Sequence, residues 1–87
     1  DEMDDRILAA TYRELTAEDK RFLIAMLDDE EESTTADLVE RLKRSPQQVS
    51  HYRRRMIDAG IIGERGRGLV AFELPFFRDY LAAQCVK

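Results

Sequence analysis

The sequence predicts a mainly helical α+β domain in which a helix-turn-helix is followed directly by a two-stranded hairpin. One helical pattern ends near Leu42 and the next begins at Pro46, so about three residues form the turn, as in a helix-turn-helix. Two β-type runs, residues 61–65 and 69–74, follow at once, and the Gly-rich basic segment 66–68 joins them.

The composition is that of one small domain. The chain has 87 residues, of which 44% are hydrophobic and 37% are charged, and this apolar content suffices for a single core. No stretch of the sequence approaches the length of a membrane span, so we expect no membrane partner. A lone cysteine, Cys85, cannot form an internal disulfide, and a cytoplasmic location is therefore expected.

Residues 1–14 are expected to form a helix that precedes the main domain. They begin without an initiator methionine and with five charged residues among the first six. We therefore expect a linker or an N-terminal helix that belongs to an upstream domain, and a main domain that spans residues 15–87. The apolar side chains at helical spacing in this segment are Met3, Ile7, Leu8 and Tyr12.

The next two helices are predicted from their N-caps. Thr16 is the expected cap of a helix over residues 17–28, with Asp19 at the capping-box position. Thr34 and Asp37 have the same spacing at the start of the following helix. The acidic run "DDEEE" between the two helices is expected to be a solvated loop. The inward-facing residues of both helices are Phe22, Leu23, Met26, Leu27, Leu38, Val39 and Leu42.

The boundary at Ser45 is the sharpest in the sequence. Ser45 is the predicted N-cap, Pro46 fits the first helical position, and Gln48 completes a capping box. The helix then runs to Ala59 and ends at Gly60, which favours the left-handed conformation that closes many helices.

The C-terminal part completes the predicted architecture. The hairpin forms a two-stranded wing, and residues 30–34 are a candidate third strand. Pro75 is expected to open a last amphipathic helix. Its predicted buried side consists of Phe76, Phe77, Tyr80 and Leu81. A helix-turn-helix followed by a wing and flanked by N- and C-terminal helices is a winged helix.

The positive charge is concentrated in one segment of an acidic chain. Residues 41–67 hold eight basic and two acidic residues, a net charge of +6, so the remaining residues carry −10 of the total of −4. Basic residues on the turn, the second motif helix and the wing are typical of nucleic-acid binding. The alternative is a solvated helix face that is merely rich in arginine.

The helical projection separates the three consecutive arginines. At about 100° per residue, Arg53 falls in the apolar sector between Val49 and Ile57, whereas Arg54 points the opposite way. We therefore predict that Arg53 is largely buried, with its guanidinium meeting solvent or a carboxylate, and that Arg54 and Arg55 are largely exposed.

The exposed face of this helix suits direct readout of a duplex. Gln can pair with adenine and Arg with guanine in the major groove, while a glycine-flanked wing can approach the minor groove or phosphates. An ordinary surface histidine and an ordinary glycine hairpin are the simpler alternatives. The candidate DNA contacts are Gln47, Gln48, Ser50, His51, Arg54, Arg55, Arg65 and Arg67.

The sequence gives no sign of a catalytic, metal or cofactor site. One Cys and one His cannot supply four zinc ligands, and no Gly-Lys-Ser/Thr phosphate loop occurs. Ser50 and His51 diverge by about 100° on a helix and cannot act as a pair. We therefore expect that this domain is not an enzyme and binds no cofactor or metal itself.

Three stretches of the sequence resemble the C-terminal winged-helix domain of a group of bacterial AAA+ ATPases, which are similar in layout to origin-recognition-type ATPases. The stretches are "LTAEDKRFLIAM", "QQVSHYRRRMIDAGII" and "GRGLVAFELPFFRDYL". The resemblance covers about residues 15–83. It implies an upstream ATPase domain in the same chain, which would bind ATP and Mg²⁺, and a domain that binds duplex DNA through its second motif helix and wing. The residues that recur in order are Tyr52, Arg53, Arg55, Gly60, Leu74 and Pro75.

The sequence thus favours a DNA-binding winged-helix module of an AAA+ ATPase. The alternative is a winged helix that docks the ATPase core or another protein, and the acidic remainder of the chain favours this alternative because it repels DNA. A free-standing transcription regulator is a third interpretation, less favoured because no effector domain or dimer helix is evident. Neither a preferred DNA sequence nor an oligomeric state follows from the residues.

Overall fold

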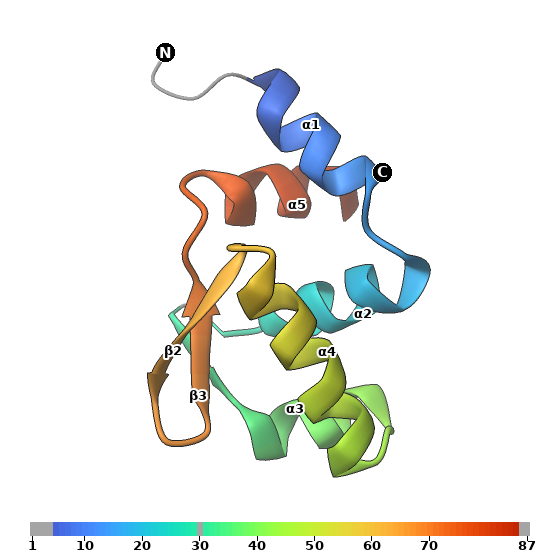
Figure 1. Cartoon of the computed structure of the whole chain (residues 1–87), viewed down its shortest axis with the longest axis vertical. Helices are drawn as coiled ribbons and strands as arrows, with labels where there is room; N and C mark the ends of the chain where they lie inside the picture. Colours follow the sequence, from blue (N-terminus) through green and yellow to red (C-terminus); the bar gives the residue numbers. More distant parts are fainter. Residues whose placement is uncertain (1–4, 30, 86–87) are drawn as a thin grey trace.

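The computed structural model describes residues 5–29 and 31–85, which form five helices and a three-stranded antiparallel sheet (Figure 1). The helix-turn-helix α3–α4 is followed directly by the hairpin β2–β3, so the predicted winged helix is confirmed. The elements are α1 (Asp5–Arg13), α2 (Ala17–Met26), β1 (Glu32–Thr34), α3 (Thr35–Leu42), α4 (Pro46–Asp58), β2 (Ile62–Gly66), β3 (Leu69–Phe72) and α5 (Phe77–Cys85).

The sheet has one strand more than the predicted two-stranded wing. Its order is β1-β3-β2, so the candidate strand before α3 pairs with β3 at the edge away from β2. Ser33 lies opposite Val70 in β3, and Val70 lies opposite Glu64 in β2. An irregularity in the register between Glu64 and Gly66 bends the wing before its turn.

The core lies between α2, α3, α4, the sheet and α5. Helix α4 turns Val49 and Met56 inward, and Tyr52 and Ile57 are half-buried beside them, as the helical projection predicts. The buried apolar cluster consists of Leu8, Phe22, Leu23, Met26, Leu38, Val49, Met56, Ile61, Ile62, Val70, Phe77 and Leu81.

The predicted N-caps fix where three helices begin. Both halves of the capping box are present at Thr16 and Asp19 and at Ser45 and Gln48. At Thr34 the hydroxyl oxygen accepts a hydrogen bond from the backbone N–H of Asp37 at 3.1 Å. These interactions satisfy backbone donors that a helix start otherwise leaves unpaired.

Helix α5 starts later than expected, and Phe76 is not on its buried side. Phe76 has a left-handed backbone with φ of 68° and is 50% exposed, whereas the next residue, Phe77, is fully buried. The backbone N–H of Phe77 donates to the carbonyl of Leu74, so residues 74–77 form a turn ahead of the helix. Pro75 therefore sits in this turn, and the reversal of the chain directs only the second phenylalanine into the core.

The acidic run after α2 is more than the predicted solvated loop. The Asp29 carboxylate accepts hydrogen bonds from the Ser33 hydroxyl at 2.7 Å and from the Arg41 guanidinium at 2.7 and 3.1 Å. The backbone carbonyl of Asp29 also accepts from Arg78 at 2.6 Å. The loop is thereby tied to α3 and α5.

Helices α1 and α5 lie together at one end of the molecule, and the wing turn and the start of α4 lie towards the other (Figure 1). The rings of Tyr12 in α1 and Tyr80 in α5 pack edge to face, with 5.9 Å between their centroids. Leu8 of α1 is buried. Ile7, which was expected on the apolar side of this helix, is 52% exposed because α1 is covered on one side only. Met3 lies outside the described residues, and the proposed boundary at residue 15 stays a prediction.

Replacement of Ser45 by Ala tests the N-cap of α4. The Ser45 Oγ accepts from the backbone N–H of Gln48 at 3.2 Å, and its loss is expected to lower the free energy of unfolding by about 1 kcal/mol. Urea denaturation of the two proteins measures this difference. Ser50→Ala, on the exposed face of the same helix, is the control, and equal midpoints for all three proteins would contradict the cap.

Candidate nucleic-acid interface

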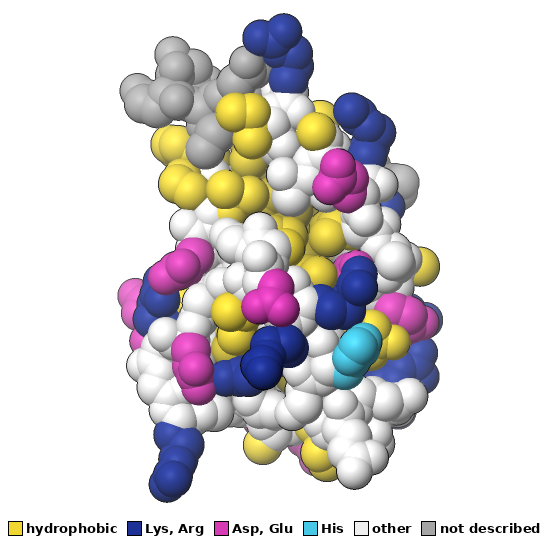
Figure 2. All heavy atoms as spheres, viewed as in Figure 1, with side chains coloured by type: hydrophobic (Ala, Val, Ile, Leu, Met, Phe, Trp, Pro, Cys, Tyr) yellow, Lys and Arg dark blue, Asp and Glu magenta, His cyan; other side chains and the backbone are white. Residues whose placement is uncertain are grey.

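The outer face of α4 carries four polar side chains that point away from the core. Gln47, Ser50, His51 and Arg54 are all exposed; Gln47, His51 and Arg54 lie opposite Val49, where the acidic and exposed Asp58 also lies, and Ser50 lies on a flank. Figure 2 shows the histidine on this surface, with Lys and Arg side chains around it. These four residues, called the outer face below, include the residues at which a helix in a major groove would meet base edges.

Arg53 turns away from the outer face, as predicted. Its side chain is 22% exposed, and its Nη2 lies 2.7 Å from the Glu64 carboxylate of β2. The Nε of Arg53 is buried and has no hydrogen-bond partner among the described residues. The pair joins α4 to the wing, so Arg53 has a structural role here.

Most of the arginines in the basic segment 41–67 are engaged by carboxylates of the same chain. Five of the seven form ion pairs within the described residues, so the net charge of +6 overstates what a ligand would meet. The pairs are Arg41 with Asp29, Arg44 with Glu18, Arg53 with Glu64, Arg55 with Asp19, and Arg65 with Glu73.

Arg55 is held by the most buried of these carboxylates. Its Nε and Nη2 donate to the two oxygens of Asp19 at 3.2 and 2.6 Å, and Asp19 is only 1% exposed. Burial raises the pKa of Asp19, but hydrogen bonds from Arg55 and Thr16 outweigh it and hold the pKa below its ordinary value of 3.8. Arg55 is exposed, as predicted, yet its guanidinium is already occupied.

The wing holds Arg65 in a similar way. Arg65 Nη1 donates to Glu73 Oε2 at 2.9 Å. The Glu73 side chain lies so close across β2 that a Cβ at Gly63 would fall 2.5 Å from its carboxyl carbon. Glycine at position 63 therefore leaves the space that the Glu73 carboxylate uses to reach Arg65.

Three cations of the basic segment have no ion-pair or hydrogen-bond partner for their side chains within the described part of the chain. They are Arg54 on the outer face, Arg67 at the wing turn, and Lys43 in the turn before α4, and all three are exposed. Lys43 was not among the predicted contacts. Its left-handed backbone, with φ of 56°, caps α3, and the only signal for it in the sequence is a basic residue inside the turn.

The predicted contacts therefore fall into two groups. The amide oxygen of Gln48 accepts from the backbone N–H of Ser45 at 3.1 Å, so Gln48, like Arg55 and Arg65, already has a partner. Gln47, Ser50, His51, Arg54 and Arg67 are free of such bonds to their side chains in the described residues, apart from an edge contact between the rings of His51 and Tyr52. Whether either group touches DNA stays a prediction.

No metal or membrane site is apparent within the described ranges. Residues 5–29 and 31–85 bring together no group of three or more side chains able to ligate a metal ion. None of the helices described there has the length and apolar character needed to cross a membrane.

Comparisons with known proteins agree with this fold. A family model described as "Domain of unknown function (DUF8462)" matches residues 5–81. The solved structure of Bordetella bronchiseptica BpsR, a protein whose DNA binding is regulated by 6-hydroxynicotinic acid, is similar with a TM-score of 0.65 at 16% sequence identity. The similarity covers 95% of this chain and 71% of that chain, and it shows a shared fold. The search of curated proteins gave no match.

Replacement of Asp19 by Asn is expected to lower stability at neutral pH. The amide cannot reproduce two charge-assisted bonds to Arg55, and the expected cost is about 1–3 kcal/mol. Folding lowers the pKa of Asp19, so the ionised carboxylate contributes to the free energy of unfolding. This contribution is complete above pH 3.8 and is lost as the pH falls through the lower pKa of the folded state.

Urea midpoints at pH 7 and pH 3 measure this effect. The difference between the wild-type protein and Asp19→Asn is expected to narrow at pH 3. Asp58→Asn, an exposed carboxylate without an ion pair among the described residues, is the control. A difference that is equal at both pH values would show that the charge of Asp19 is unimportant.

Proposed function

The chain belongs to the DUF8462 family, and we propose that it is a winged-helix module that binds duplex DNA through the outer face of α4 and the turn of its wing. The observation that supports this most directly is the distribution of unpaired side chains. The exposed helix of the motif keeps Gln47, Ser50, His51 and Arg54 free, and the segments on either side of it supply Lys43 and Arg67.

The electrostatics of α4 favour a polyanion at its start. The first turn of α4 contains no acidic residue, so the partial positive charge of the helix N-terminus is not offset there. Lys43 directly precedes this turn and adds a positive charge. A phosphate near the start of α4 would place Gln47 and Arg54 against base edges or the adjoining backbone.

The fold comparison gives independent support for this proposal. BpsR, which shares the fold, is a protein whose DNA binding is under regulation. At 16% identity this likeness does not carry residues across, and the assignment of contacts therefore depends on exposure and pairing in this chain.

Arg67→Ala and Arg54→Ala test the phosphate contacts. Each is expected to reduce the slope of log affinity against log salt by about 0.9, because one fewer counterion is released from the duplex. Fluorescence anisotropy with a random duplex at several salt concentrations measures the slope. Arg65→Ala is the matched control in the same wing, and its slope should change less because Glu73 already holds Arg65.

Gln47→Ala tests base readout. The loss of an amide that pairs with base edges is expected to weaken binding to some sequences by about 1–3 kcal/mol and to leave others unchanged. Selection from a random duplex library, for the wild-type protein and for the variant, measures this preference. Identical selected sequences would show that Gln47 does not read base edges.

Docking of another protein is the second candidate function, and the internal ion pairs favour it. With five of its arginines engaged, the basic segment attracts DNA less than its composition indicates. The outer face would then contact the ATPase core or another subunit. No measurable binding to duplex at low salt, together with retained binding to such a partner, would decide for this function.

We also propose that this domain is the C-terminal module of an AAA+ ATPase and is not itself an enzyme. The proposal is supported by the resemblance of residues 15–83 to such modules. ATP and Mg²⁺ would bind to the upstream domain of the parent. The full-length gene tests this directly, since a Gly-x-x-x-x-Gly-Lys-Ser/Thr loop must then precede the domain.

A further inference from the structure

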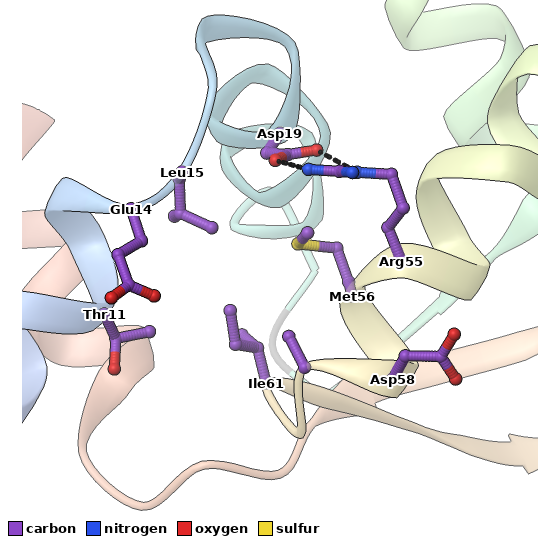
Figure 3. Close-up of a pocket in the computed structure, with 9 residues that line it drawn as sticks. Thr11, Glu14, Leu15, Asp19, Arg55, Met56, Asp58 and Ile61 are labelled. Atoms are coloured by element: carbon purple, nitrogen blue, oxygen red, sulfur yellow. Dashed lines mark hydrogen bonds and ion pairs between the residues drawn. The ribbon is translucent and has the colours of Figure 1, made fainter.

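An open pocket of about 530 Å³ lies between the end of α1 and the end of α4. Glu14 and Leu15 line it from the α1 side, and Met56 and Ala59 line it from the α4 side. Figure 3 shows these two sides facing each other, with the pair of Asp19 and Arg55 at one edge. The volume is within the range of pockets that hold small molecules, about 300–1,000 Å³.

The floor of the pocket is apolar and adaptable. Leu15 is half-buried, Met56 and Ile61 are buried, and all three side chains are directed towards the same space in Figure 3. A methionine thioether fits its shape to different partners because its side chain is unbranched and flexible. Met56 and Ile61 are 2% and 1% exposed, so a small hydrophobic body would contact mainly Leu15 and the exposed edges of these two side chains.

The uncompensated charge at the pocket is negative. Arg55 and Asp19 neutralise each other at one edge of the pocket, where Arg55 Nη2 lies 2.6 Å from Asp19 Oδ2. The Asp58 side chain points away from the gap in Figure 3. The Glu14 carboxylate is exposed and has no ion-pair or hydrogen-bond partner among the described residues, so it remains available to a ligand.

We infer that this pocket binds a small organic cation, with its ammonium group at Glu14 and its apolar body on Leu15, Met56 and Ile61. A carboxylate ligand is disfavoured, because Nε and Nη2 of Arg55 already donate to Asp19 and Glu14 repels a negative charge.

Ligand binding in the pocket is coupled to the DNA affinity of the outer face of α4. This consequence rests on the proposed function. Arg55 and Met56 belong to the last turn of α4, the helix that presents Arg54, and Ala59 is the C-cap of this helix. A ligand that bridges α1 and this turn favours one placement of α4, and any change in DNA affinity must be matched by an equal change in ligand affinity.

The binding test uses the isotope-labelled domain and three probes of equal shape: phenethylamine, 2-phenylethanol and phenylacetate. NMR titration is expected to show saturable shifts of the backbone amides of Leu15, Met56 and Ile61 with phenethylamine, and affinities at least several-fold weaker for the other two probes. The absence of saturable shifts at these residues, or equal affinities for the three probes, would overturn the inference.

Glu14→Gln is expected to weaken phenethylamine binding about three- to fivefold, as for the loss of one partly exposed charge pair. Glu40→Gln, an exposed and unpaired carboxylate of α3 within the described residues, is the matched control and should leave binding unchanged. Equal effects of the two substitutions would show that Glu14 does not recognise the cation.

Anisotropy with duplex DNA, with and without phenethylamine at matched ionic strength, tests the coupling. An unchanged DNA affinity would overturn the coupling alone. A domain that binds no DNA would overturn the proposed function. The NMR titration shows whether the pocket binds phenethylamine, whatever the result with DNA.

Discussion

One buried carboxylate, that of Asp19, fixes the relation between the first core helix and the helix that would read DNA. It accepts the backbone N–H of Thr16 at 3.2 Å, which closes the cap of α2, and it accepts two bonds from Arg55 of α4. A buried carboxylate without a partner costs several kcal/mol, so these bonds must form when the core closes. The contact joins the last turn of α4 to the start of α2, while the buried Val49 and Met56 determine which residues of α4 face outwards.

The same kind of pairing connects the remaining elements of the domain. Arg41 joins α3 to the loop after α2, and Arg53 joins α4 to β2. Several acidic residues of this chain are therefore partners of its arginines, and these carboxylates do more than surround a basic patch with repulsive charge. Within residues 41–67, the exposed positive charge that remains unpaired is small and specific in position, at Lys43, Arg54 and Arg67.

If the proposed function holds, this division explains how a chain with a net charge of −4 would bind a nucleic acid. A few unpaired cations next to polar side chains give a weak, salt-dependent attraction and leave discrimination to base contacts. The winged-helix fold provides the geometry, since it places one helix and one hairpin turn where both can meet a duplex. The pocket beside the last turn of α4 is where the inferred organic cation would contact the same helix.

The sequence by itself determined the helices, their caps, the tight turn and the inward and outward faces of α4, because these depend on neighbours three or four residues apart. The spacing of Ser45 and Gln48 and the position of Arg53 were sufficient for those predictions. Only the tertiary structure decided which arginines are free, because their partners are distant in the chain: Arg55 and Asp19 are 36 positions apart, and Arg44 and Glu18 are 26 apart. No local pattern encodes such pairs, and they form only when the packing of the core brings the helices together.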